Sequence, residues 1–427
     1  MLLQMPPAES HYRKSSMFKN IRLMTPILGL IWSIAGSAAF AADGDTAIAV
    51  GASVSLTGPD VTLRSGNRAI PVGREFVKYQ VRRIANDWLY LVSDRAAGWV
   101  RNDQVVPVER SEGHLTAILE RDPNLTWARL WRAAVLLDRK DLPKAQADLS
   151  SILAREPTDV SALALRGRVL TVKGDFDAAI TDLDKAIALA PSNPRAYLYR
   201  AAARQAKKQL EKADEDFAEA LRLDPNDVEA YLMRGIVRRD QDRLDDAIAD
   251  SNAAVRLAPR NARAFLERAI ARKEKGQLDW ALADLNEAVN LDPESAQAFL
   301  NLSIVRFLLR DFAGAYDSAE SALKLAPADK ETLNHMAWLL ATVPEAKFRD
   351  GRRAVGYARQ ADQIAEGKDP DVMDTLSAAL AEDGKFDEAL AMMTRALEFY
   401  PKDNPERPEA EKRLELFKSR KAFRSDP

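Results

Sequence analysis

The feature of the sequence that most constrains its fold is a proline that recurs every 34 residues. Because proline cannot continue a helical hydrogen-bond ladder, each one is expected just after the end of a helix. A fixed period of this length indicates an array of repeated units that stack on their neighbours. The seven prolines that keep this spacing are Pro123, Pro157, Pro191, Pro225, Pro259, Pro293 and Pro327.

Other columns of residues keep the same step when each unit is numbered from the third residue after its proline. Small residues occupy the eighth position in Ala133, Gly167, Ala201, Gly235, Ala269 and Ser303, and alanine occupies the twentieth from Ala145 to Ala315. Large residues occupy the fourth position in Leu163, Tyr197, Tyr231, Phe265 and Phe299. This pattern predicts paired helices that approach closely at the small residues, with the large side chains filling the space between pairs.

These columns resemble the tetratricopeptide repeat over residues 111–403. The resemblance implies a mainly α fold, an α-solenoid in which antiparallel helix pairs form a right-handed superhelix. In the seventh repeat the small residue falls at Ala354, five residues late, so an insertion is expected between its helices. Residues 404–427 are expected to form a polar capping helix and a tail.

Two charged columns predict ion pairs inside the array. The seventh position holds Arg132, Arg166, Arg200, Arg234 and Arg268, and the twenty-third holds Asp148, Asp182, Asp216, Asp250 and Asp284. Both are lost together in the sixth repeat, to Leu302 and Ser318. Because the seventh position faces other helices, each guanidinium there needs a carboxylate beside it. The alternative is that the arginines line a site for an anionic ligand.

In proteins with this repeat, partners usually bind the inner surface formed by positions two, five, six, nine and twelve of each first helix. Those positions imply a partner groove that is apolar and aromatic near its N-terminal end, with cations further along. Its candidate residues are Trp127, Trp131, Leu165, Arg168, Tyr199, Met233 and Arg239. The alternative for Trp127 and Trp131 is packing against the preceding domain or the helix at residues 112–121.

Residues 42–110 differ from the repeats, because short β-branched and aromatic runs alternate with turn residues there. We expect about five short strands. The run Asp87–Val92 followed by Gly98–Val100 resembles the end of a bacterial Src-homology-3-like domain, and Thr62–Gly66 also fits that family. The resemblance implies a small all-β barrel that binds peptides or cell-wall fragments.

Four aromatic residues could line a groove of that barrel: Tyr79, Trp88, Tyr90 and Trp99. The alternative is that Trp88 and Trp99 fill the core, because so small a domain needs large side chains to bury enough surface.

The first 41 residues have the order of a signal peptide. Basic residues are followed by the apolar run Leu23–Ile34 and then by small residues, with Ala39–Ala41 as the expected cleavage motif. The remainder is therefore expected outside the cytoplasm, in the periplasm or envelope. Met17 is an alternative start, and an uncleaved membrane anchor is the alternative to cleavage.

Composition narrows the classes of function. A net charge of −2 disfavours a nucleic-acid partner. With no cysteine and three histidines there is little material for a metal site or a nucleophilic triad, and His335 with Asp350 is the one histidine–acid pair near an irregular loop. We expect a non-enzymatic scaffold without cofactors that binds a protein or peptide, or alternatively an accessory protein that binds the cell wall through its N-terminal domain.

Overall fold

The computed structural model describes residues 48–65, 68–70, 77–85, 88–93 and 96–425. The expected signal peptide lies outside these residues. The chain divides into two compact units, with the boundary between Ala230 and Tyr231, and each unit is described by itself. None of the helices among the described residues is long and apolar enough to cross a membrane.

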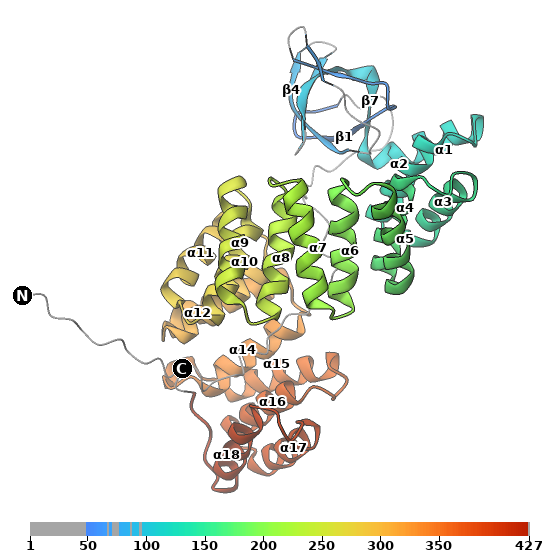
Figure 1. Ribbon diagram of the computed structural model, residues 1–427. Coiled ribbons are helices and arrows are strands. Elements are labelled where there is room, and N and C mark those ends of the chain that lie inside the picture. The colour runs from blue at the N-terminus through green and yellow to red at the C-terminus, as the bar shows by residue number, and fades with distance from the viewer. Residues whose placement is uncertain (1–47, 66–67, 71–76, 86–87, 94–95, 426–427) are drawn as a thin grey trace, which may run out of the picture. The chain divides into compact units, whose positions relative to one another are not determined.

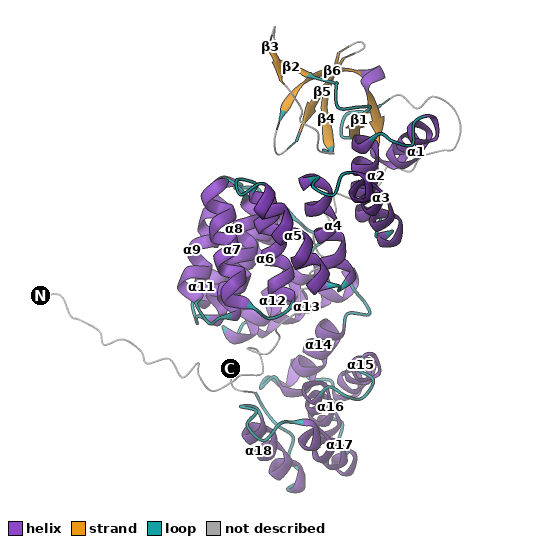
Figure 2. Cartoon of the chain, turned by 45° about the vertical axis from the view of Figure 1, so that its right-hand side comes forward, coloured by secondary structure: helices purple, strands orange, loops and turns teal. Residues whose placement is uncertain are grey.

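The first unit begins with an antiparallel sheet. Its strands are β1 (Ser53–Leu56), β2 (Leu63–Ser65), β3 (Arg68–Ile70), β4 (Tyr79–Ala85), β5 (Trp88–Val92), β6 (Ala97–Arg101) and β7 (Val105–Pro107), paired in the order β3-β2-β6-β5-β4-β1-β7. Figure 2 shows these strands, in orange, gathered next to α1 (Ser111–Arg121) and α2 (Thr126–Asp138). Within the described residues, the short end strands β3 and β7 pair only with β2 and β1, so the sheet is open rather than the expected closed barrel.

Helices make up the rest of the first unit. They continue with α3 (Leu142–Arg155), α4 (Val160–Lys173), α5 (Phe176–Leu189), α6 (Pro194–Ala206) and α7 (Leu210–Leu223), and α8 (Val228–Asp240) contains the boundary. Successive helices pack side by side, as α6 and α7 do in Figure 1. The small residues make this packing close, because a Cβ on Gly167 would lie 2.5 Å from Cγ of Leu183 on the next helix.

The second unit contains ten further α-helices within the described residues 231–425. They are α9 (Leu244–Leu257), α10 (Ala262–Glu274), α11 (Leu278–Leu291), α12 (Ala296–Leu308), α13 (Phe312–Leu325), α14 (Lys330–Thr342), α15 (Gly351–Ile364), α16 (Pro370–Glu382), α17 (Phe386–Phe399) and α18 (Arg407–Lys418). The predicted insertion lies between α14 and α15 and contains the short 3-10 helix Ala346–Phe348.

The proline column marks where one helix pair ends and the next begins. Two residues after each proline from Pro157 to Pro327 stands an Asp, Asn or Ser. The side chain of each of these residues accepts a hydrogen bond from a backbone N–H in the first turn of the next helix, as Asp159 does from Ala162 at 2.7 Å. Such N-caps satisfy otherwise orphaned donors and fix the start of each first helix.

The inserted turn imposes a steric requirement at Gly351. A Cβ there would lie 2.5 Å from the backbone N of Asp383, whereas a Cβ on Gly356 in the same helix would meet nothing within 4 Å. We expect Gly351→Ala to destabilise the second unit by about 1–3 kcal/mol, because backbone of α16 would have to shift. Gly356→Ala should stabilise it by up to about 1 kcal/mol through helix propensity. Denaturant unfolding checks both variants, and equal effects would contradict the packing described.

Candidate partner-binding site

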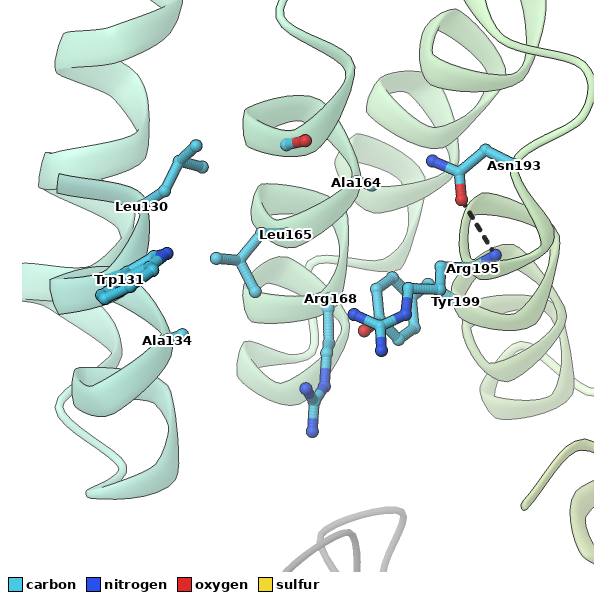
Figure 3. A pocket seen from close by; sticks show the side chains of 10 residues that line it. Leu130, Trp131, Ala134, Ala164, Leu165, Arg168, Asn193, Arg195 and Tyr199 are labelled. Carbon is cyan, nitrogen blue, oxygen red and sulfur yellow. Dashed lines mark hydrogen bonds between the residues drawn. The ribbon is translucent and has the colours of Figure 1, made fainter. Parts of the chain in front are cut away.

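A pocket of about 110 Å³ lies on one face of α2, α4 and α6 in the first unit. Figure 3 shows Leu130 and Trp131 pointing toward Leu165 on the neighbouring helix, with Arg168 between Leu165 and Tyr199. The lining residues are Leu130, Trp131, Ala134, Ser161, Ala164, Leu165, Arg168, Asn193, Arg195 and Tyr199. Nine of these ten occupy positions two, five, six or nine of their repeats, so the predicted inner surface is hollowed here.

The pocket is electropositive as well as apolar. Its ten lining residues include two arginines and no carboxylate. The Arg168 guanidinium lies 5.4 Å from the centre of the Tyr199 ring, and its Nε is buried without a hydrogen-bond partner among the described residues. A buried donor left without an acceptor is costly. The arrangement therefore favours an occupant that brings an acidic oxygen together with an apolar group.

Four of the seven predicted groove residues meet in this pocket: Trp131, Leu165, Arg168 and Tyr199. Trp131 is also only 3% exposed, and it packs with Trp127 in the cluster that contains the core of the sheet. The rings of Trp127 and Trp131 meet edge to face, 5.3 Å apart. Trp127 thus packs against the N-terminal domain, as its alternative reading held, while Trp131 serves both the core and the pocket wall.

The other two predicted groove residues lie in the second unit. Met233 is buried. Arg239 donates a hydrogen bond of 2.9 Å to Glu267 and lies 3.8 Å from Glu274, so it is held by its own chain rather than presented to a partner. One repeat later the buried Lys273 donates to Asn301 at 3.1 Å, and burial lowers the pKa of Lys273 to about 8. The expected cations of this stretch therefore form an internal polar network.

The structure pairs each arginine of the seventh position with the aspartate of the twenty-third. In all five repeats Nε and Nη2 each donate to one carboxylate oxygen, at 2.6–3.0 Å. The aspartates are 3–4% exposed. Hydrogen bonding to Asp182 raises the pKa of Arg166 against the opposing effect of burial. These arginines are thus structural and are not available to an anionic ligand.

Sequence reasoning missed a second arginine at most of these aspartates. Arg204, Arg238 and Arg272 donate to Asp216, Asp250 and Asp284 at 2.6–2.9 Å, and Arg129 donates to Asp148 at 3.1 Å. Three of them share the eleventh position, so their 34-residue spacing was the available signal. Each buried aspartate of these four repeats therefore holds two guanidinium groups.

The sheet has a second aromatic surface. Leu89, Leu91 and Val100 point into the core, so the alternation along β5 and β6 places Trp88, Tyr90 and Trp99 on the opposite face, half-buried. The rings of Tyr90 and Trp99 lie 5.2 Å apart, and Arg64 lies 5.8 Å from the ring of Trp88. Trp88 and Trp99 are thus not core residues. Tyr79 is, at 1% exposed, and cannot line a groove.

His335 is not placed for catalysis. It is 2% exposed, its Nε2 lies 2.8 Å from Oγ of Ser303, and burial lowers its pKa to about 3. Asp350 instead caps α15 by accepting from the backbone N–H of Arg353. Within the described residues, no group of three or more His, Asp or Glu side chains is arranged to hold a metal ion.

Comparisons with known proteins identify the helix pairs. Residues 167–208 match a family model described as TPR repeat, and residues 198–262 and 266–330 match one described as tetratricopeptide repeat. The chain therefore contains tetratricopeptide repeats, which generally mediate protein–protein interactions, and nothing in these comparisons indicates an enzyme. No curated protein matches the chain.

Solved structures share the fold at low identity. A chain of the crystal structure of the APC/C hetero-tetramer Cut9-Hcn1 is 17% identical with a TM-score of 0.54, over 73% of this chain and 59% of that one, which is less than two thirds of its length. A tetratricopeptide repeat protein from Parabacteroides merdae is 18% identical with a TM-score of 0.48, over 64% of this chain and 99% of that one. YrrB, a TPR protein with an unusual peptide-binding site, is 21% identical with a TM-score of 0.37, over 43% and 95%.

Proposed function

We propose that this protein is a non-catalytic, exported scaffold that holds a protein or peptide partner in the pocket of α2, α4 and α6. The observation that carries the proposal is the Arg168 side chain, whose buried Nε lacks an acceptor in a pocket with apolar walls and no lining carboxylate. Export is supported by the order of basic, apolar and small residues in the first 41 positions.

The chemistry of the walls indicates which segment fits. Leu130, Trp131 and Leu165 offer an apolar surface, and Arg168 and Arg195 favour an anion beside it. A guanidinium can hold a carboxylate through two parallel hydrogen bonds. The partner segment therefore presents an apolar side chain next to an Asp, a Glu or a terminal carboxylate.

Selection from a displayed peptide library tests this preference. The wild-type chain should enrich peptides in which an acidic residue neighbours an aromatic or aliphatic one. Arg168→Ala should weaken their binding about 10- to 100-fold, the value of a charge-assisted hydrogen bond. Lys173→Ala is the matched control, since it removes an exposed cation from the same helix. Equal enrichment by Arg168→Ala and the wild type would refute the assignment of the pocket.

A second candidate function rests on the outer face of the sheet, where Trp88, Tyr90, Trp99 and Arg64 lie together. Exposed aromatic rings beside a cation suit a wall glycan or stem peptide, and the same strands carry the likeness to bacterial Src-homology-3-like domains. Under this reading Trp88→Ala/Tyr90→Ala abolishes binding to purified cell wall and leaves the Arg168-dependent peptides unaffected. Unchanged wall binding would exclude this candidate.

A further inference from the structure

The C-terminal tail folds back onto the second unit. Helix α18 ends at Lys418, Arg420 adopts a left-handed φ of 54°, and residues 421–425 have no regular secondary structure. The ring of Phe423 lies 5.7 Å from the ring of Trp338 on α14. Arg424 pairs with Glu382 on α16 at 2.7 Å, and the Ser425 N–H donates to the carbonyl of Thr342 at 2.9 Å. The tail is therefore seated on α14 and α16 by stacking, charge and a backbone hydrogen bond.

The repeat register shows which face of α14 the tail covers. Trp338 stands at the ninth position of its repeat, five periods of 34 residues after Arg168. Arg168 lines the pocket of the first unit. In α14, the side chain at the equivalent position is covered by a segment of the protein's own chain.

The tail is held more weakly than the helix that precedes it. Helix α18 is anchored by the buried Arg413–Asp374 pair and by Phe417, which is fully buried. Phe423, by contrast, is half-buried, and Arg424 is 37% exposed at its side chain. Segments with few buried contacts and no regular structure are the ones that open locally.

One buried polar atom in the seat is left without a partner by the tail. Nε1 of Trp338 has no hydrogen-bond partner among the described residues, although Trp338 is only 3% exposed. A segment that placed a carbonyl or carboxylate oxygen there would make a hydrogen bond that the tail does not make.

We infer that the Trp338–Glu382 face is a second peptide site, specific for an aromatic side chain followed by a basic one, and that residues 421–425 occupy it as a displaceable internal ligand. This site is separate from the pocket of the first unit, and it needs no acidic partner. A tethered segment competes at a high effective concentration, so the site is largely closed to outside segments until a tighter one arrives.

The test uses the full chain and a fluorescent peptide with the sequence of residues 419–427. Phe423→Ala/Arg424→Ala should bind this peptide at least about tenfold more tightly than the wild type, because the competing tail no longer fills the site. Lys421→Ala removes an exposed cation of the same tail and should bind as the wild type does. A peptide in which alanine replaces its phenylalanine should not bind any of the chains.

Two results would overturn the inference. Equal affinity of the wild type and Phe423→Ala/Arg424→Ala, or no binding by either, would make the tail no competitor for a ligand site. Loss of helical circular dichroism in Phe423→Ala/Arg424→Ala would make the tail a structural cap rather than a displaceable segment.

Discussion

Replacing Asp216 by asparagine is expected to destabilise the middle of the first unit by about 3 kcal/mol, because two guanidinium groups lose their buried counter-charge. Asp216 is 3% exposed and accepts from Arg200 on two oxygens and from Arg204 at 2.8 Å. Asparagine has nearly the same shape, so the loss reports the charge rather than a cavity. The effect should be local, because repeat arrays are stabilised chiefly by contacts between neighbours.

Asp184 provides the matched control for this prediction. Arg200 also donates to Asp184, at 2.6 Å, but the Asp184 side chain is 52% exposed. Asp184→Asn should therefore change stability by no more than about 1 kcal/mol. Hydrogen exchange should show faster exchange across α6 and α7 in Asp216→Asn while the sheet keeps its protection. Equal effects of the two variants, or a sheet that opens with the helices, would contradict the buried ladder of ion pairs.

Replacing Arg413 by methionine is the second change with a large expected effect. Arg413 donates through Nε and Nη2 to Asp374, and both side chains are buried. Its removal leaves a carboxylate without a partner in the interior, which should cost about 3–5 kcal/mol in the unfolding free energy of the second unit. Lys412→Met is the control on the neighbouring residue, since Lys412 pairs with Glu409 at the surface.

The loss in Arg413→Met should depend on pH in a defined direction. Burial already raises the pKa of Asp374 above its ordinary value, even with Arg413 beside it. A carboxyl whose pKa is raised in the folded state stabilises that state below its unfolded pKa, and the contribution is lost as pH rises through the folded pKa. The variant should therefore regain stability on acidification, and Asp374→Leu/Arg413→Met should recover most of the loss at neutral pH. Chemical denaturation across pH measures both, and a deficit that is constant with pH would contradict an unpaired Asp374.

The repeats were predictable from the sequence because each helix pair depends on residues at a fixed spacing. The proline column, the small residues such as Gly167 and the paired loss of Arg and Asp at Leu302 and Ser318 all follow one period. Helix ends, close approaches and intrarepeat ion pairs can be read from such columns, since the partners lie 16 residues apart within one repeat.

Contacts between repeats were harder to foresee. Arg239 looked like a groove cation, but its partner Glu267 lies 28 residues away on the first helix of the next repeat. The numbering of single repeats does not show such a pair. The pocket was foreseen in part, because Trp131, Leu165, Arg168 and Tyr199 share the expected inner positions. That Arg168 has a buried donor without an acceptor required the structure.

The N-terminal sheet and the tail exceeded what sequence could provide for different reasons. Alternation along β5 indicates two faces, but the pattern does not say which is buried, so Trp88 and Tyr79 could not be assigned between core and surface. The tail has no period and no regular secondary structure, and its seat on Trp338 depends on the turn after α18.

The central claim, that the pocket of α2, α4 and α6 holds a protein partner, is tested most directly by a photo-crosslinking amino acid at Ser161. Ser161 is exposed and lines the pocket, whereas Lys185 is exposed on α5 and does not. The account predicts one specific crosslinked protein from position 161 in the native envelope, absent from position 185 and lost when Arg168→Ala is added. The same crosslinks from both positions, or a crosslink that persists in Arg168→Ala, would contradict it.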